Sequence, residues 1–581
     1  MNYLRLTTLA LAALLTLGAC GNNEDTGEVA GSSAANPLLS HVPADTPYVF
    51  ANLEPVPDDV IDTFLTRLQP VLDSLQSQLG EARTELESTG SIADDPAARL
   101  AHALLQELDG KLNRAGVESM GLDLSSHRVL YGLGAFPVVR LGLSDSAMLR
   151  ETILRVLDNA GIQAPELQHQ GVSYWRVGPD HSDEIAAGLY ISILENHLAV
   201  GLLPEKAEAE LLPAFLGLDM PLNSDAQARL QKLNSNHDYT DYGSGILDVR
   251  KLADQFMSRD AIAGRLMAES GAFDPAGLSP ACITEIHQII DNTPLMTMGI
   301  QELSKSAFAV QYRLETPETL GSQLAGLVSK IPAADALSSR VLELAFGMRF
   351  GPVRDFLREK ATAITANPYQ CEHLVELNDN AAQALEQLNQ PMPPFLNNFL
   401  GVRVSLSEIV MDQDSLPENA RGFMAVHVDQ PQMFVGMAQM FLPDLSSLEI
   451  KPGEPAVRLP ESLVPVPGMV AFAAMSQDAI GIALGENEQA GLQGFLEQDA
   501  GPEGTFLSAS YDMAAYMDYT GKLGDHYEMQ AGNDGQHLQS PAVDDLRKAA
   551  SRAFRDMADR SHTTMRFTPG GLVIENRTTF K

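Results

Sequence analysis

The sequence predicts an α+β fold made of two tandem related lobes, each a curved and mainly antiparallel sheet covered by helices. Three observations support this prediction. The chain has 581 residues, which is more than a single hydrophobic core normally holds. Short alternating apolar segments follow one another through tight turns, as antiparallel strands do. The same order of strands and helices is found twice along the chain.

The N-terminus has the three parts of a secretory signal. Arg5 supplies a positive charge, an apolar run covers residues 6–17, and small residues precede Cys20. The apolar run is shorter than the roughly 20 residues that span a bilayer. We therefore expect residues 1–19 to be removed as a signal peptide. Residues 20–36 are rich in Gly, Ser, Asn, Ala and acidic residues, so they predict a flexible tether.

Residues 17–20, Leu-Gly-Ala-Cys, resemble the lipobox of bacterial lipoproteins. The resemblance implies that Cys20 receives a diacylglyceryl group, that the chain is cleaved before it, and that the new amino terminus is acylated. Three acyl chains would anchor the protein permanently, since each buried methylene contributes about 0.8 kcal/mol. Gly21 and Asn22 follow the cysteine, whereas lipoproteins that stay in the inner membrane typically have Asp at the first of these positions. We therefore expect a protein anchored in the outer membrane, on its periplasmic face; an ordinary signal peptide that ends in Cys is the alternative.

The first lobe is predicted over residues 37–304. An alternating strand begins at Tyr48, and a helical insert follows over about 57–115. Asp145 ends a later strand and precedes a predicted helix over 146–159, where apolar residues recur at three- and four-residue spacing. Asp is a suitable cap at that position because its carboxylate accepts hydrogen bonds from first-turn amides.

The remainder of this lobe predicts further strands. From Gly188 the pattern is a strand, a tight turn at Glu195 and Asn196, a second strand and a helix. Ser244 begins another strand, and a hairpin from Thr297 closes the lobe.

The second lobe is predicted over residues 305–581 and repeats this order, with a helical insert over about 316–390 and a helix over 431–442. Five pairs of segments correspond in sequence order, which favours duplication over chance recurrence. The pairs begin at Tyr48 and Phe308, Val138 and Phe423, Gly188 and Gly468, Ser244 and Thr505, and Thr297 and Thr564. The hairpin from Thr297 also contains the strand at Phe308 that opens the second lobe, so we expect little linker and lobes that pack on each other.

The charge balance limits the partners. The formal net charge is −37 at pH 7, and such a surface repels phosphate backbones. Nucleic acid and anionic lipid headgroups are therefore excluded as main partners, whereas divalent cations and basic proteins are permitted. The acidic balance is also what keeps a soluble domain in solution.

Two cysteines remain after Cys20. In an oxidising periplasm, Cys282 and Cys371 predict a disulfide more readily than a metal site or a nucleophile. Because one precedes and the other follows the junction of the lobes, the bond would link the two lobes. Two reduced buried thiols are the alternative. His373 follows Cys371 closely, but no second pair at ligand spacing supports zinc.

Local motifs for catalysis, phosphate binding, dinucleotide binding and calcium are absent from the sequence. Two acidic loops contain side chains that could bind a metal, although solvated hairpin loops need no such function. Their residues are Asp180, His181, Asp183 and Glu184 in one loop, and Asp412, Asp414 and Glu418 in the other. Tyr174 and Trp175 are expected to fill a core. We expect no catalytic residue, no cofactor and no metal site.

Residues 43–47, Pro-Ala-Asp-Thr-Pro, stand before the first strand. Together with the repeated strand and helix units, they give the chain a loose resemblance to large duplicated bacterial lipoproteins of unknown function, which implies no catalytic residues. The sequence favours a non-enzymatic lipoprotein that binds or scaffolds an envelope component through its two lobes. A carrier of an apolar or lipid ligand and a hydrolase without a local motif are the alternatives.

Overall fold

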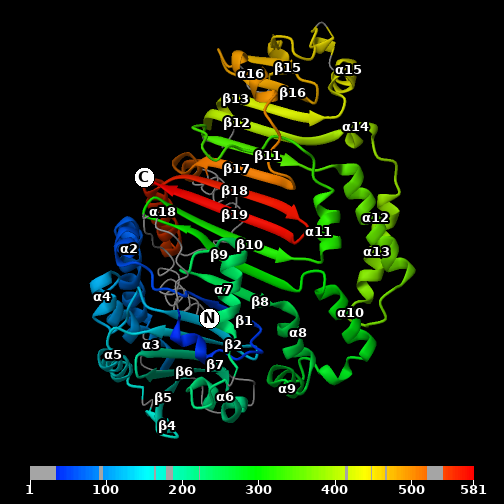
Figure 1. Cartoon of the computed structure of the whole chain (residues 1–581). Coiled ribbons are helices and arrows are strands. Elements are labelled where there is room, and N and C mark those ends of the chain that lie inside the picture. Colours follow the sequence, from blue (N-terminus) through cyan, green and yellow to red (C-terminus); the bar gives the residue numbers. More distant parts are fainter. Residues whose placement is uncertain are drawn as a thin grey trace. The chain divides into compact units, whose positions relative to one another are not determined.

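The computed structural model describes residues 35–89, 96–162, 165–177, 187–221, 223–411, 417–441, 443–446, 448–464, 468–519 and 541–581. The predicted signal peptide and Cys20 lie outside the described residues. Helices and antiparallel strands alternate through the chain (Figure 1), which confirms the α+β class. Among the described residues, no helix is long and apolar enough to cross a membrane.

The chain forms two compact units, and each is made of segments that are not contiguous. Unit 1 consists of Met1–Ser279, Pro294–Gln311 and Gln539–Ala553; unit 2 consists of Pro280–Thr293, Tyr312–Leu538 and Phe554–Lys581.

The sheet of unit 1 has the strand order β5-β6-β7-β3-β2-β1-β8-β9, with each of these pairs antiparallel. The short strand β4 (Leu167–His169) pairs with β5, and β10 (Ala307–Glu315) follows β9 through a tight turn. The other strands are β1 (Tyr48–Ala51), β2 (Arg128–Leu133), β3 (Phe136–Gly142), β5 (Val172–Val177), β6 (Ala187–Leu194), β7 (His197–Pro204), β8 (Ser244–Asp248) and β9 (Leu295–Leu303).

The α-helices of unit 1 are α2 (Asp58–Thr89), α3 (Pro96–Leu108), α4 (Arg114–Glu118), α5 (Ser146–Asn159), α6 (Glu208–Phe215), α7 (Ala226–His237), α8 (Val249–Met257) and α9 (Ile262–Glu269). Asp145 caps α5 as expected, since its carboxylate accepts hydrogen bonds from the amides of Ala147 and Met148 at 2.9 and 3.0 Å. The apolar core lies where α6, α7 and the short helix η1 (Pro37–His41) pack against the sheet.

The sheet of unit 2 has the strand order β14-β15-β16-β13-β12-β11-β17-β18-β19, and each of these pairs is antiparallel. Ser476, Gln477 and Asp478 form the expected turn between β15 and β16. The strands are β11 (Leu342–Gly347), β12 (Phe399–Met411), β13 (Pro417–Val428), β14 (Val457–Arg458), β15 (Ala471–Met475), β16 (Ala479–Leu484), β17 (Thr505–Asp512), β18 (Ala558–Thr568) and β19 (Gly571–Phe580).

The helices of unit 2 include a pair, α12 and α13, whose members run side by side (Figure 1). Helix α16 packs on β13, β15 and β16, where Leu492, Phe495 and Leu496 form a small apolar core with the strands. A Cβ atom at Gly481 would lie 2.6 Å from Leu496 Cδ2, so this close approach of helix and sheet requires glycine. The helices are α10 (Pro280–Ile290), α11 (Glu318–Ala325), α12 (Phe350–Ala366), α13 (Val375–Leu388), α14 (Pro394–Asn397), α15 (Pro431–Phe441) and α16 (Gln489–Leu496), and α18 (Pro541–Met557) has residues in both units.

Candidate functional site

The two faces of the sheet in unit 2 differ in composition. Successive side chains of a strand point to opposite faces, so the register assigns each residue to a face. One face, here the covered face, carries Arg403, Phe423 and Ala425 and packs under α16. The opposite face, here the open face, consists of three neighbouring rows of side chains that run from β16 through β13, β12, β11, β17 and β18 to β19. The rows are Ile480, Val426, Val402, Phe346, Leu507, Met565 and Ile574; Ile482, Met424, Val404, Leu344, Ala509, Thr563 and Asn576; and Leu484, Gly422, Leu406, Leu342, Tyr511, Ser561 and Thr578.

The open face is apolar where it is exposed to solvent. Met424 is 44% exposed, Val426 37% and Ile482 36%, whereas Phe423 and Ala425, which alternate with them on β13, are 5% and 4% exposed. Most other side chains of the rows are half-buried. Antiparallel sheets with one solvated face usually place polar residues on it. Unit 2 therefore has apolar residues on the face of its sheet where polar residues are usual.

None of the side chains in the three rows is charged, although charged residues make up 20% of the chain. Glu343, Arg403 and Arg560 of the same strands lie on the covered face and are hydrogen-bonded there. The Glu343 carboxylate accepts hydrogen bonds from the Ser338 and Ser405 hydroxyls at 2.9 and 3.0 Å. Contiguous exposed apolar surface of this kind is typical of a binding site.

Arg403 is 4% exposed and donates a hydrogen bond of 2.8 Å to the Phe495 carbonyl near the end of α16. Burial lowers the pKa of Arg403 to about 10. His427 lies nearby on β13, and burial together with the Arg403 charge lowers its pKa to about 4. Arg403 thus attaches the helix to the sheet, since a cation is favourable at the C-terminal end of a helix.

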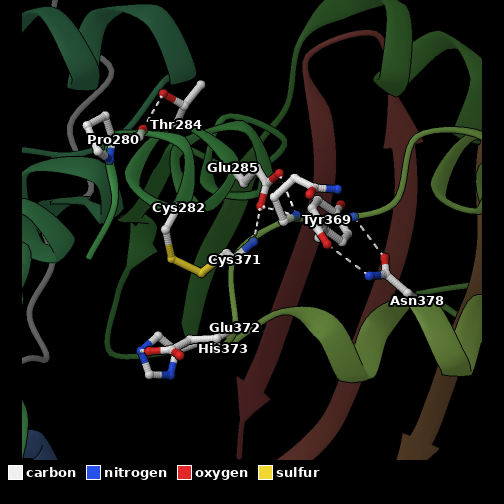
Figure 2. Close-up of a disulfide and its surroundings, with 10 residues drawn as sticks. Pro280, Cys282, Thr284, Glu285, Tyr369, Cys371, Glu372, His373 and Asn378 are labelled. Carbon is white, nitrogen blue, oxygen red and sulfur yellow. Dashed lines mark hydrogen bonds and ion pairs between the residues drawn. A yellow bond between two sulfur atoms is a disulfide. The ribbon is translucent and has the colours of Figure 1, made fainter. Parts of the chain in front are cut away.

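The structure brings Cys282 and Cys371 together as a disulfide, with 4.4 Å between their Cα atoms. Figure 2 shows how the bond joins α10 to the segment between α12 and α13. The Glu285 carboxylate strengthens this connection, because it accepts hydrogen bonds from the amides of Gln370 and Cys371 at 2.9 and 2.8 Å. Both cysteines belong to unit 2, so the expected link between lobes is instead a link within one unit.

The other residues that the sequence singled out do not form a site in the described part of the chain. Trp175 is 1% exposed, and Tyr174 donates a hydrogen bond of 3.0 Å to Glu208, so both fill the core as expected. His373 is exposed and lies 3.6 Å from Glu372. Within the described ranges, no group of three or more His, Cys, Asp or Glu residues could hold a metal ion. Cys20, Asp180, His181, Asp183, Glu184, Asp412 and Asp414 lie outside the described residues, and so does the side chain of Glu418.

Comparison with known proteins gives no further assignment. No family model matches the sequence, and no curated protein and no solved structure matches it. The open face was not among the sites expected from the sequence. The available signal was the alternation in β12, but the usual rule would have placed Arg403 and Ser405 toward solvent and Val402 and Val404 toward the core.

Proposed function

We propose that this protein is a non-enzymatic envelope lipoprotein, anchored in the outer membrane through acylated Cys20 and facing the periplasm, that binds apolar ligands on the open face of unit 2. The observation that supports the binding activity is the uncharged and partly exposed set of rows around Met424, Val426 and Ile482. The support for the anchor is the sequence of residues 17–20.

An apolar ligand suits this face better than a protein partner. Covering apolar surface stabilises a complex by roughly 25 cal/mol for each Å² removed from water. Protein partners are also steered and kept in register by complementary charges, and the rows offer none. The carrier hypothesis is therefore preferred to the scaffold hypothesis, and no contact described above favours a hydrolase.

We also propose that the two units derive from one duplicated lobe. The strand orders β5-β6-β7-β3-β2-β1-β8-β9 and β14-β15-β16-β13-β12-β11-β17-β18 support this, because they are the same order when the strands are matched in sequence. Four of the five expected segment pairs agree with that matching. The first does not: the counterpart of β1 is β11, which begins at Leu342, and not the strand at Phe308.

The binding activity can be tested with N-phenyl-1-naphthylamine, an uncharged apolar probe that becomes fluorescent in apolar sites. We expect the full-length protein, solubilised in mild detergent and then exchanged into lipid nanodiscs, to bind the probe above the level of empty nanodiscs. Met424→Glu should weaken this binding at least roughly tenfold, about 1.4 kcal/mol, because a carboxylate must then lose water on the open face.

Met440→Glu is the matched control. Met440 is 74% exposed on α15 of the same unit, so the same change of charge there should leave probe binding unaltered. Equal binding by wild type and Met424→Glu, with both proteins folded by circular dichroism, would contradict the proposed function.

A further inference from the structure

The side chains of the open face change from apolar to polar across the sheet. On β11, β12, β13 and β16 it is apolar, but on β18 and β19 two of the three rows end in uncharged polar side chains. These residues are Ser561, Thr563, Asn576 and Thr578, and they are here called the polar strip. The rows themselves make the strip continuous with the apolar part, since Thr563 stands opposite Ala509 and Ser561 opposite Tyr511.

The side chains of the polar strip are held in place by one another. The Asn576 amide donates hydrogen bonds to the Thr563 hydroxyl at 2.8 Å and to the Ser561 hydroxyl at 3.1 Å. Thr578 donates to Ser561 at 3.2 Å. In these bonds the hydroxyls of Ser561 and Thr563 are acceptors, and each hydroxyl also has one proton to donate. The strip is therefore a fixed set of neutral donors and acceptors beside an apolar surface.

Two arginine side chains of these strands that could bind an anionic group lie on the covered face and not on the open face. Arg403 points to the Phe495 carbonyl on the covered face, and Arg560 donates to the Ser510 hydroxyl, also on the covered face, at 2.8 Å. With a net charge of −37 on the whole chain, a carboxylate or phosphate at the polar strip would meet repulsion, and the three described rows contain no cation to compensate it.

We propose that the ligand of the open face is an amphiphile whose acyl chain lies on the apolar rows and whose uncharged, hydroxyl-bearing head group lies on the polar strip. This inference rests on the proposed function and narrows it to one chemical class. Tyr511, between Leu342 and Ser561 in the third row, stands where the acyl chain meets the head group. Head-group hydroxyls accept hydrogen bonds from Thr563 and donate to the Asn576 carbonyl oxygen, which also accepts a hydrogen bond of 3.4 Å from Thr578. Ser561 is only 2% exposed, so its part is to hold Asn576 and Thr578 in place.

Competition against bound N-phenyl-1-naphthylamine tests this inference with two ligands of equal chain length, monolauroylglycerol and laurate. We expect monolauroylglycerol to displace the probe at a concentration at least roughly tenfold lower than laurate does. Thr563→Val combined with Asn576→Leu should abolish that preference, which is measured as the ratio of the two displacing concentrations in the same variant and so does not depend on its affinity for the probe. Thr564→Val is the matched control, because Thr564 is the next residue on β18 and belongs to the covered face; it should retain the preference.

The outcomes separate the two proposals. Failure of the wild-type protein to bind the probe contradicts the proposed function and this inference together. Probe binding with equal displacement by the two ligands, or a preference that persists in the double variant, overturns the inference alone.

Discussion

In each unit, a buried arginine on the helix-covered face of the sheet donates a hydrogen bond to the end of the covering helix. In unit 1, Arg140 on β3 is fully buried and donates to the Phe215 carbonyl at the end of α6, at 2.7 Å. In unit 2, Arg403 on β12 donates to the Phe495 carbonyl near the end of α16. The arginines are not at matching positions, since β3 corresponds in strand order to β13. An arginine on a sheet can thus satisfy the end of a covering helix from more than one strand.

The two arginines differ in the number of hydrogen-bond partners of their guanidinium groups. Arg140 also donates to the Tyr131 hydroxyl at 3.1 Å and to His197 Nε2 at 2.9 Å. It lies beside a large apolar core. Arg403 has Gln498 as its second partner, beside a much smaller core. Unit 1 therefore depends on packing around a cation with several hydrogen-bond partners, whereas unit 2 has the disulfide as an additional constraint.

The opposite faces differ as well. Unit 1 has a comparable half-buried row of Phe50, Leu130, Val139, Val200 and Ile191. The row ends at Trp175, which is fully buried, and a neighbouring position carries the charged Arg128. Among the described residues of the two sheets, the three adjacent uncharged rows are found in unit 2, so the two faces differ in charge.

The largest expected effect concerns the disulfide. In the chain-entropy estimate, a bond across a sequence separation of 89 residues contributes about 4 kcal/mol, so Cys282→Ala with Cys371→Ala should destabilise unit 2 by this order. Guanidinium unfolding can be followed by circular dichroism and by fluorescence of Trp175, the only tryptophan, which reports on unit 1. The circular dichroism midpoint should fall and the Trp175 midpoint should not. A fall in the Trp175 midpoint alone would show that the disulfide stabilises unit 1 and not unit 2.

Replacing each arginine by methionine should show how much it contributes to the stability of its unit. Arg140→Met leaves the Phe215 carbonyl, the Tyr131 hydroxyl and His197 without their donor, and we expect a loss of roughly 3 kcal/mol in unit 1. Arg403→Met removes fewer hydrogen bonds, so we expect roughly 2 kcal/mol in unit 2. The unfolding experiment above measures both. An equal or larger effect at Arg403 would show that the number of bonded partners does not decide the difference.

Lowering the pH should destabilise unit 1 more than unit 2. The expected loss of stability for each histidine is no larger than the effects of the substitutions above. Burial and the Arg140 charge lower the pKa of His41 to about 3 and that of His197 to about 4, and in unit 2 burial and Arg403 lower that of His427 to about 4. All three are neutral in the folded chain at pH 7, and in the unfolded chain they take up protons as the pH falls through about 6.5. As the pH falls from 6.5 toward 4, only the unfolded chain binds the protons, so stability falls.

At pH 5 this loss is roughly 2 kcal/mol for His197 and for His427 and smaller for the partly exposed His41, where solvent screens the Arg140 charge. The Trp175 midpoint should therefore decrease more than the circular dichroism midpoint between pH 7 and pH 5. His197→Gln should reduce the pH dependence of the Trp175 midpoint, because it removes one of the histidine rings of unit 1 whose pKa is lowered in the folded chain. Identical pH dependence in this variant and the wild type would contradict the assignment to His197.

The sequence alone determined the local structure. Strands, turns and helices followed from apolar periodicity, and the Asp145 cap followed from the chemistry of unpaired first-turn amides. The pairing of Cys282 with Cys371 followed from their being the two cysteines left after Cys20 in a chain that the sequence predicts to be exported. These features depend on residues close in sequence or on a choice between very few partners.

Only the tertiary structure decided which face of each sheet is covered. Alternation in β12 places Val402 and Val404 on one face and Arg403 and Ser405 on the other, but alternation is the same whichever face receives the helix. That choice is made by α16, a segment more than 80 residues later in the chain, whose end is bonded by Arg403. Contacts between residues far apart in sequence likewise place Cys282 in unit 2 and leave Met424, Val426 and Ile482 exposed on the opposite face.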